Sequence, residues 1–187
     1  YPGRIARWAD TNGIRSGGHL LLEEHMDSHV IGYGNFFQAM KEQHIPGCDV
    51  PMPDPGDYWA FWFPKLISSV AQLRGRETVS ALFDPIIYRR VAALQPKPES
   101  MLRSLNMAFL TGLNQICSYV AWDQYPPEVY RRFNENVGRL AVMLRGARNA
   151  STIAMYYPIE SYQSRFLPSP KVWTEAERDD RESLRAS

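Results

Sequence analysis

The sequence predicts an α/β fold built around a parallel sheet. Short runs of β-branched and apolar residues alternate with longer amphipathic runs along most of the chain. This order is typical of right-handed βαβ units. Two architectures fit it: an open, doubly wound sheet, or part of a (β/α)8 barrel, which needs about 250 residues when whole. The chain has 187 residues, so the barrel interpretation requires strands that are missing upstream.

The predicted strands are short runs bounded by glycine, proline or capping residues. They cover residues 19–23, 48–50, 78–83, 114–122 and 152–157. The first is the most informative, because its apolar residues run directly into Glu23 and Glu24. A buried parallel strand has this pattern when its carboxyl end opens into a functional site.

The predicted helices follow from their start and stop signals. A first helix, near residues 3–12, ends at Asn12-Gly13. Asn35 and Gln38 resemble the N-cap and N3 residues of a capping box, and that helix should run to about residue 44. Later helices are expected to end at Gly75, to cover 99–111, to run from Pro126-Pro127 to residue 145, and to cover 175–185. The helix that ends at Gly75 should carry Leu66, Val70 and Leu73 on one side.

The composition is typical of an ordinary globular protein. The formal net charge is +1, which gives no electrostatic preference for nucleic acid or an anionic membrane. No apolar run approaches the roughly 20 residues of a membrane span, and no signal peptide is seen. The chain starts inside a helical pattern without Met, so we expect a fragment. Cys48 and Cys117 lie in predicted strands and are expected to be buried free thiols.

Several stretches resemble, in order, motifs of bacterial barrel glycoside hydrolases related to the α-L-rhamnosidase and β-galactosidase types. The matching stretches are 16–24, the "PGID"-like 44–49, the "PK-x-x-SS-x-A"-like 64–71, 79–81, the "G-x-N"-like 112–116, and 154–159. The resemblance implies the C-terminal half of a (β/α)8 TIM-type barrel over 1–125, a linker helix over 126–149, and the start of a flavodoxin-like segment over 150–187. It also implies a carbohydrate substrate, further domains on both sides in the same parent protein, and a periplasmic or secreted location.

The resemblance favours Glu23 as the catalytic carboxylate. Along a strand, Glu23 shares a face with His19, whereas Glu24 shares the other face with Leu20. Only one of the two carboxylates can therefore point into a barrel, and burial near aromatic residues could make it a general acid. Both being solvated loop residues is the competing interpretation.

The relatives have a glutamate where this chain has Ala81. Without that glutamate, the usual reaction with two carboxylates cannot proceed. Three explanations stay open: an engineered substitution, a natural inactive member, or a member whose carboxylate comes from elsewhere, for example Asp84. A non-catalytic carbohydrate-binding or scaffold domain is the alternative function.

The remaining candidates are substrate-binding residues near strand ends. They are His19, Asp49, Tyr119, Trp122 and Asp123. An aromatic cluster over residues 58–63 either lines a substrate cleft or is covered by a neighbouring domain. Asn114 and Gln115 begin a strand, at the wrong end of a barrel for catalysis, and are predicted to be structural.

No metal and no cofactor is expected. His25 and His29 have i, i+4 spacing, but Met26 stands where the zinc-protease pattern has glutamate. Ser16-Gly17-Gly18 precedes a strand, whereas a phosphate-binding loop follows one and opens a helix. A G-x-S-x-G elbow is also absent, which argues against an α/β-hydrolase.

Overall fold

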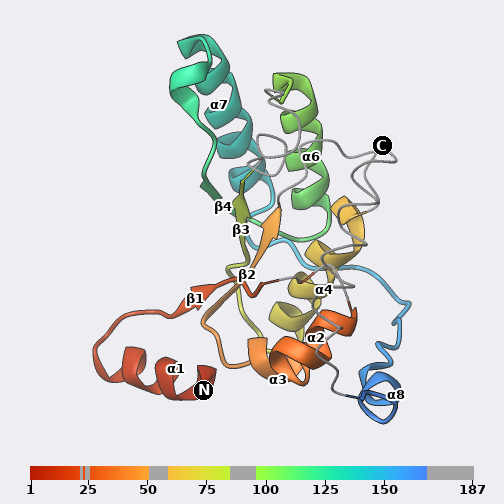
Figure 1. Cartoon of the computed structure of the whole chain (residues 1–187). Helices are drawn as coiled ribbons and strands as arrows, with labels where there is room; N and C mark the ends of the chain where they lie inside the picture. The colour runs from red at the N-terminus through yellow and green to blue at the C-terminus, as the bar shows by residue number, and fades with distance from the viewer. Residues whose placement is uncertain (22, 24–25, 51–58, 85–95, 168–187) are drawn as a thin grey trace.

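Four parallel strands, each next to its predecessor in the chain, form the centre of the structure (Figure 1). The computed structural model describes residues 1–21, 23, 26–50, 59–84 and 96–167. The strands are β1 (Gly17–Gly18), β2 (Ile45–Val50), β3 (Ser80–Phe83) and β4 (Gln115–Ser118). The sheet curls like half of a barrel. A doubly wound sheet reverses its strand order at a switch point, and the described strands contain no such reversal.

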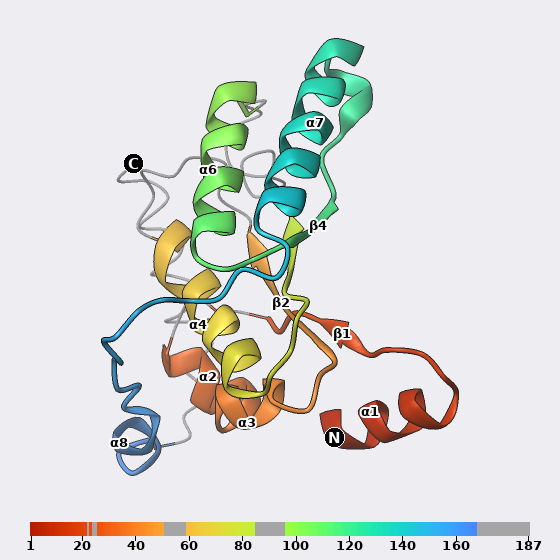
Figure 2. The ribbon, with the colours of Figure 1, turned by 180° about the vertical axis from the view of Figure 1, so that it is seen from behind.

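Helices connect the strands and cover one face of the sheet. They are α1 (Pro2–Thr11), α2 (Met26–Tyr33), α3 (Phe36–Met40), α4 (Trp59–Leu73), α6 (Pro98–Leu110), α7 (Pro127–Met143) and α8 (Ile159–Gln163), with a 3-10 turn, η1, over Trp122–Gln124. Figure 2 shows α4 and α6 on the same side of the sheet and α7 beside α6. No helix in the described ranges is long and apolar enough to cross a membrane.

The alternation of side chains along the strands decides which residues enter the core. Cys48 pairs with Ala81, and Val50 pairs with Phe83, across β2 and β3. All four are buried in the apolar cluster that also holds residues from α4 and α6, among them Ile67, Val70, Met101 and Leu105. The alternate positions, Asp49 and Leu82, are only partly buried, so they lie on the opposite, concave face.

The predicted start and stop signals of the helices are largely confirmed. The Asn35 side chain accepts a hydrogen bond from the Gln38 amide at 3.1 Å, as the capping box predicts. Gly75, Gly112 and Gly146 follow α4, α6 and α7 with positive φ angles of 62°, 110° and 73°, the conformation that ends helices at glycine. The helix opened by Asn35 ends at Met40, however, before residue 44.

The strand predictions erred in extent. No described residue of the strand expected over 19–23 lies in a strand: β1 comprises only Gly17 and Gly18, so Glu23 lies in the turn after it. The strand expected over 114–122 ends at Ser118, and Trp122 begins η1. Residues 152–157 form no strand, because no described strand pairs with them, and Ile153 and Met155 are exposed.

One burial prediction was also wrong. Cys48 is a buried free thiol, as expected, but Cys117 is exposed, because it pairs with Leu82 and so lies on the concave face of the sheet. Leu66 and Val70 of α4 pack in or against the core, whereas Leu73, at the last position of that helix, is exposed. The predicted helix over 175–185 lies outside the described residues.

Gly47 allows β1, β2 and β3 to approach one another. A Cβ at this position would lie 2.4 Å from Ser80 Oγ and 3.1 Å from the Gly18 carbonyl oxygen. Gly47→Ala is therefore expected to lower the free energy of unfolding by about 1–3 kcal/mol through overpacking. Urea unfolding measures the change. Gly138→Ala in α7, where a Cβ would meet nothing within 4 Å, is the control and should be neutral or stabilising. Equal effects of the two variants would refute the argument.

Candidate functional site

The carboxyl ends of β1, β2 and β3 bring three carboxylate residues to one edge of the sheet. Glu23 follows β1, Asp49 is the next-to-last residue of β2, and Asp84 directly follows β3. Parallel strands end at the same edge, so these residues are neighbours in the fold although they are far apart in the sequence. The carboxyl edge of parallel strands is where α/β proteins place their chemistry.

The Glu23 side chain is fully buried and bridges the ends of β1 and β2. Its Oε2 accepts a hydrogen bond from the Asp49 amide at 2.9 Å, and its Oε1 accepts one from the Leu20 amide. Backbone amides can only donate, so both bonds favour the ionised carboxylate. The Glu23 side chain thus connects the ends of β1 and β2, the two strand ends at which the sequence predicts the site residues Glu23 and Asp49. In this conformation its carboxylate is closed off from solvent.

His19 lies beside this carboxylate. Its Nδ1 is 3.8 Å from Glu23 Oε1 and 2.8 Å from the Leu20 carbonyl oxygen. The carbonyl can only accept, so Nδ1 carries the proton. His19 is partly exposed, which places a histidine at the surface of the carboxylate cluster.

Asp84 lies on the concave face of the sheet, and Ala81 does not. The Asp84 amide donates to the Val50 carbonyl oxygen at 3.3 Å, which continues the β2–β3 ladder by one residue. By alternation, Asp84 shares the face of Leu82 and Asp49. Ala81 points the other way, into the apolar core, and has no exposed surface. A carboxylate at position 81 would face the helices, so this site holds Asp84 as the carboxylate that β3 supplies.

The residues predicted at the end of β4 separate into packed and exposed ones. Trp122 packs among the rings of Tyr125, Tyr130 and Phe133, with centroids 5.9, 5.1 and 4.8 Å away. Its Nε1 donates to Ser118 Oγ at 3.2 Å. Trp122 therefore helps attach α7 to the sheet, which limits its use as a platform for a sugar.

Tyr119 and Asp123 are both exposed near the same sheet edge. Of the predicted substrate-binding residues that follow β4, these two keep side chains that a ligand could reach. Glu24 and His25 lie outside the described residues, as does Tyr58 of the aromatic cluster. Within that cluster Phe63 is fully buried and Trp62 is packed against the core.

A buried histidine behind Glu23 was missed as a site residue by the sequence reasoning, which considered it only for metal binding. His29 Nε2 lies 2.6 Å from the Glu23 carbonyl oxygen, and Nδ1 contacts the hydroxyl of Tyr157. The ring stacks on Phe36 at a centroid distance of 4.4 Å. No group of three metal-binding side chains occurs in the described part of the chain, and the bonds of His29 give it a different role.

The phenol of Tyr157 is half-buried, and this burial raises its pKa, with further contributions from Glu160 and Tyr162. The ordinary pKa of tyrosine is 10.0. Above that pH the unfolded chain releases this proton before the folded chain does. The contribution of Tyr157 to the free energy of unfolding is therefore complete below pH 10.0 and is lost as the pH rises above it. We expect the free energy of unfolding to fall by up to about 1.4 kcal/mol per pH unit there. Urea unfolding across this range should show a smaller slope in Tyr157→Phe. Tyr119→Phe, at an exposed tyrosine, is the control, and an unchanged slope in Tyr157→Phe would contradict the prediction.

A Ser–His–Asp chain lies at the opposite, amino-terminal edge of the sheet. Ser16 Oγ and the Ser16 amide both lie 3.0 Å from His44 Nδ1, and His44 Nε2 lies 2.9 Å from Asp10 Oδ1. The amide bond already uses the Nδ1 lone pair that a nucleophilic serine would need. The chain ties α1 to the start of β1 and β2, and we interpret it as structural.

Asn114 is structural at the same edge, as the sequence predicted. Its Oδ1 accepts from the Val79 amide at 2.9 Å, and its Nδ2 donates to the Glu77 carbonyl oxygen at 2.7 Å. These bonds hold the segments that enter β3 and β4 side by side. The residue thus aligns two strands and lies away from the carboxylates.

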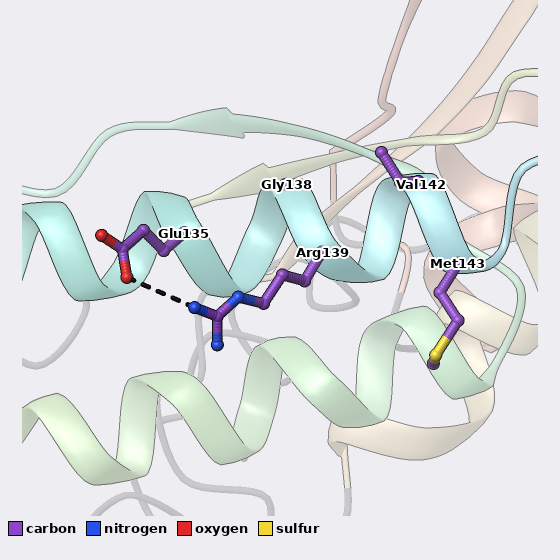
Figure 3. Close-up of a pocket in the computed structure, with 5 residues that line it drawn as sticks. All are labelled: Glu135, Gly138, Arg139, Val142 and Met143. Carbon is purple, nitrogen blue, oxygen red and sulfur yellow. Dashed lines mark ion pairs between the residues drawn. The ribbon is translucent and has the colours of Figure 1, made fainter.

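A groove lies along α7, away from the strand ends that carry Glu23, Asp49 and Asp84, and Figure 3 shows its lining. It is lined by Glu135, Gly138, Arg139, Val142 and Met143, all from one helix. Arg139 pairs with Glu135 at 3.7 Å, one turn away. The groove brings together no titratable group that the ion pair does not already use, so it adds nothing to the site at the strand ends.

Comparison with known proteins leaves this geometry as the basis for assigning a function. No protein-family model, curated protein or solved structure matches the chain.

Proposed function

We propose that this chain is the C-terminal half of a (β/α)8 glycoside hydrolase barrel, followed by the start of a flavodoxin-like segment. The observation that carries the proposal is the group of carboxylate residues from three successive strand ends, Glu23, Asp49 and Asp84, at one edge of a curled parallel sheet. Hydrolysis of a glycosidic bond needs two such groups, one to protonate the leaving oxygen and one to act as base or nucleophile. The substrate is an oligo- or polysaccharide.

Within this proposal, Asp84 takes the role that the relatives give to a glutamate at position 81. Asp84 lies on the same face of the sheet as Asp49, whereas Ala81 faces the apolar core. Glu23 accepts two backbone hydrogen bonds, so it acts as an ionised group that fixes the strand ends and contributes negative charge beside an oxocarbenium-like transition state. Asp49 is then the general acid and Asp84 the base or nucleophile, and the exposed His19, Tyr119 and Asp123 contact sugar hydroxyls.

Hydrolysis of a panel of aryl glycosides by the full parent protein tests the proposal. Asp84→Asn is expected to lower kcat/KM by at least about 100-fold, the contribution typical of a general acid or base. Glu135→Gln, at an exposed carboxylate of α7 that lies apart from the strand ends, is the control and should leave kcat/KM unchanged. Activity that is unchanged in Asp84→Asn would refute the assignment, and absence of hydrolysis by the parent protein would refute the enzymatic function.

The alternative function is carbohydrate binding without catalysis. It is favoured by one observation, the complete burial of the Glu23 carboxylate. Isothermal titration with soluble polysaccharides separates the two functions. Binding by the parent protein that is lost in Tyr119→Ala, together with no turnover of any glycoside, would support the alternative.

A further inference from the structure

The chain segment after α7 returns across the molecule and contacts α2, the helix that follows the Glu23 turn. Figures 1 and 2 show this segment running past α4 to α8, beside α2. Ile159 is buried there, and the Gln163 side chain donates to the Gly34 carbonyl oxygen at 2.5 Å. Tyr157, at the front of this docked segment, meets His29. A residue 128 positions away in sequence thus contacts the candidate site.

The hydrogen bonds of His29 determine its tautomer. The Glu23 carbonyl oxygen can only accept, so Nε2 carries the proton and donates it at 2.6 Å. In the neutral ring Nδ1 then carries a lone pair, and the Tyr157 hydroxyl donates to it. Every polar atom of the buried ring has one partner of the correct type. Such complete pairing favours one ring orientation over all others.

Aromatic side chains enclose this pair. The His29 ring stacks on Phe36 with an interplanar angle of 18°, and Tyr33, Trp62 and Tyr157 lie around it at centroid distances of 6.2, 6.3 and 5.8 Å. His29 has no exposed surface. The packed rings around His29 allow little movement of the imidazole.

The contacts continue from His29 to the end of β2. His29 holds the Glu23 carbonyl oxygen, and the Glu23 carboxylate holds the Asp49 amide at 2.9 Å. We infer that Tyr157 and His29 are positioning residues, which set the place of the Glu23 carboxylate against the Asp49 amide without touching a substrate. This inference deepens the proposed function and rests on it for its catalytic consequence.

The Asp49 amide offers a direct readout of the Glu23 carboxylate. A hydrogen bond to a carboxylate moves an amide proton resonance downfield, so we expect this signal at low field in the full chain, and at higher field in Glu23→Gln. Tyr157→Phe should move the Asp49 signal in the same direction as Glu23→Gln does. Ile159 and Gln163 keep the segment docked in this variant, so the shift would report the loss of the hydroxyl alone.

Tyr156→Phe is the matched control. It also removes one tyrosine hydroxyl and one hydrogen bond, to Glu160 at 3.1 Å, but its side chain is exposed. The Asp49 amide proton should keep its chemical shift in this variant. If Tyr157→Phe also leaves the chemical shifts of the Asp49 and Leu20 amide protons unchanged, the inference is wrong.

Kinetics of the parent protein supply the second measurement. Tyr157→Phe is expected to lower kcat about tenfold with KM nearly unchanged, because small misplacement of a charged group beside the transition state affects the transition state more than ground-state binding. If Tyr157→Phe changes the chemical shift of the Asp49 amide proton but the parent protein and its variants hydrolyse no glycoside, the proposed function is refuted and the positioning role stands. Unchanged amide chemical shifts together with an unchanged kcat would refute the positioning role alone.

Discussion

Ala81→Glu is expected to destabilise the protein by roughly 3–5 kcal/mol. Ala81 has no exposed surface and lies in the apolar cluster between β3 and the helices. A glutamate there either keeps its charge without a partner in an apolar environment or becomes protonated at a cost in free energy. Its four heavy atoms beyond Cβ also need space in a packed core. Since typical domains are stable by only about 5–15 kcal/mol, much of the stability would be lost.

Urea unfolding followed by circular dichroism measures this effect, and Ala147→Glu provides the matched control. Ala147 is exposed, so the same substitution there should change stability by no more than about 0.5 kcal/mol. If Ala81→Glu folds with the stability of the unchanged chain, Ala81 cannot face the core. A gain of glycosidase activity in that variant would show that position 81 belongs to the site after all.

The second large effect is expected for Glu23→Ala, which should lower the free energy of unfolding by roughly 3 kcal/mol. The substitution leaves the amides of Leu20 and Asp49 without their acceptor. It also leaves a cavity where a fully buried side chain was. Each unpaired buried donor costs about 1–3 kcal/mol. Glu23→Gln should cost less, because its amide oxygen can still accept one of the two bonds.

Thermal and urea unfolding compare these variants with Glu99→Ala. Glu99 is exposed, and its distance to Arg132 is 3.9 Å, so its removal should cost at most about 1 kcal/mol. Equal losses for Glu23→Ala and Glu99→Ala would mean that the bridge between β1 and β2 contributes little. A larger loss for Glu23→Gln than for Glu23→Ala would contradict the hydrogen-bond account.

Local signals in the sequence predicted the helices better than the strands. The cap of Asn35 and the glycines that end α4, α6 and α7 depend on neighbouring residues only, and the structure confirms them. The extent of β4 and the absence of a strand over 152–157 depend on which segments find a partner in the sheet. Hydrogen bonds between strands are contacts over long distances in sequence, and a run of apolar residues does not define them.

The candidate site divides in the same way. Its position at the carboxyl ends of parallel strands, and the membership of Glu23 and Asp49, could be predicted from the sequence, as could the structural role of Asn114. The role of His29 could not, because its partner Tyr157 comes from a segment that was expected to form a strand of a following domain. The burial of Trp122 against α7 likewise depends on helix packing.

The sequence by itself determined that this protein has an α/β fold, where α3 starts and where α4, α6 and α7 end, and which strand ends carry acidic residues. The tertiary structure decided which of those residues share a face. Strand side chains alternate, so the register of β2 against β3 directs Ala81 into the core and Asp84 to the concave face. A shift of one residue would exchange the two, and only the pairing of the strands determines that register.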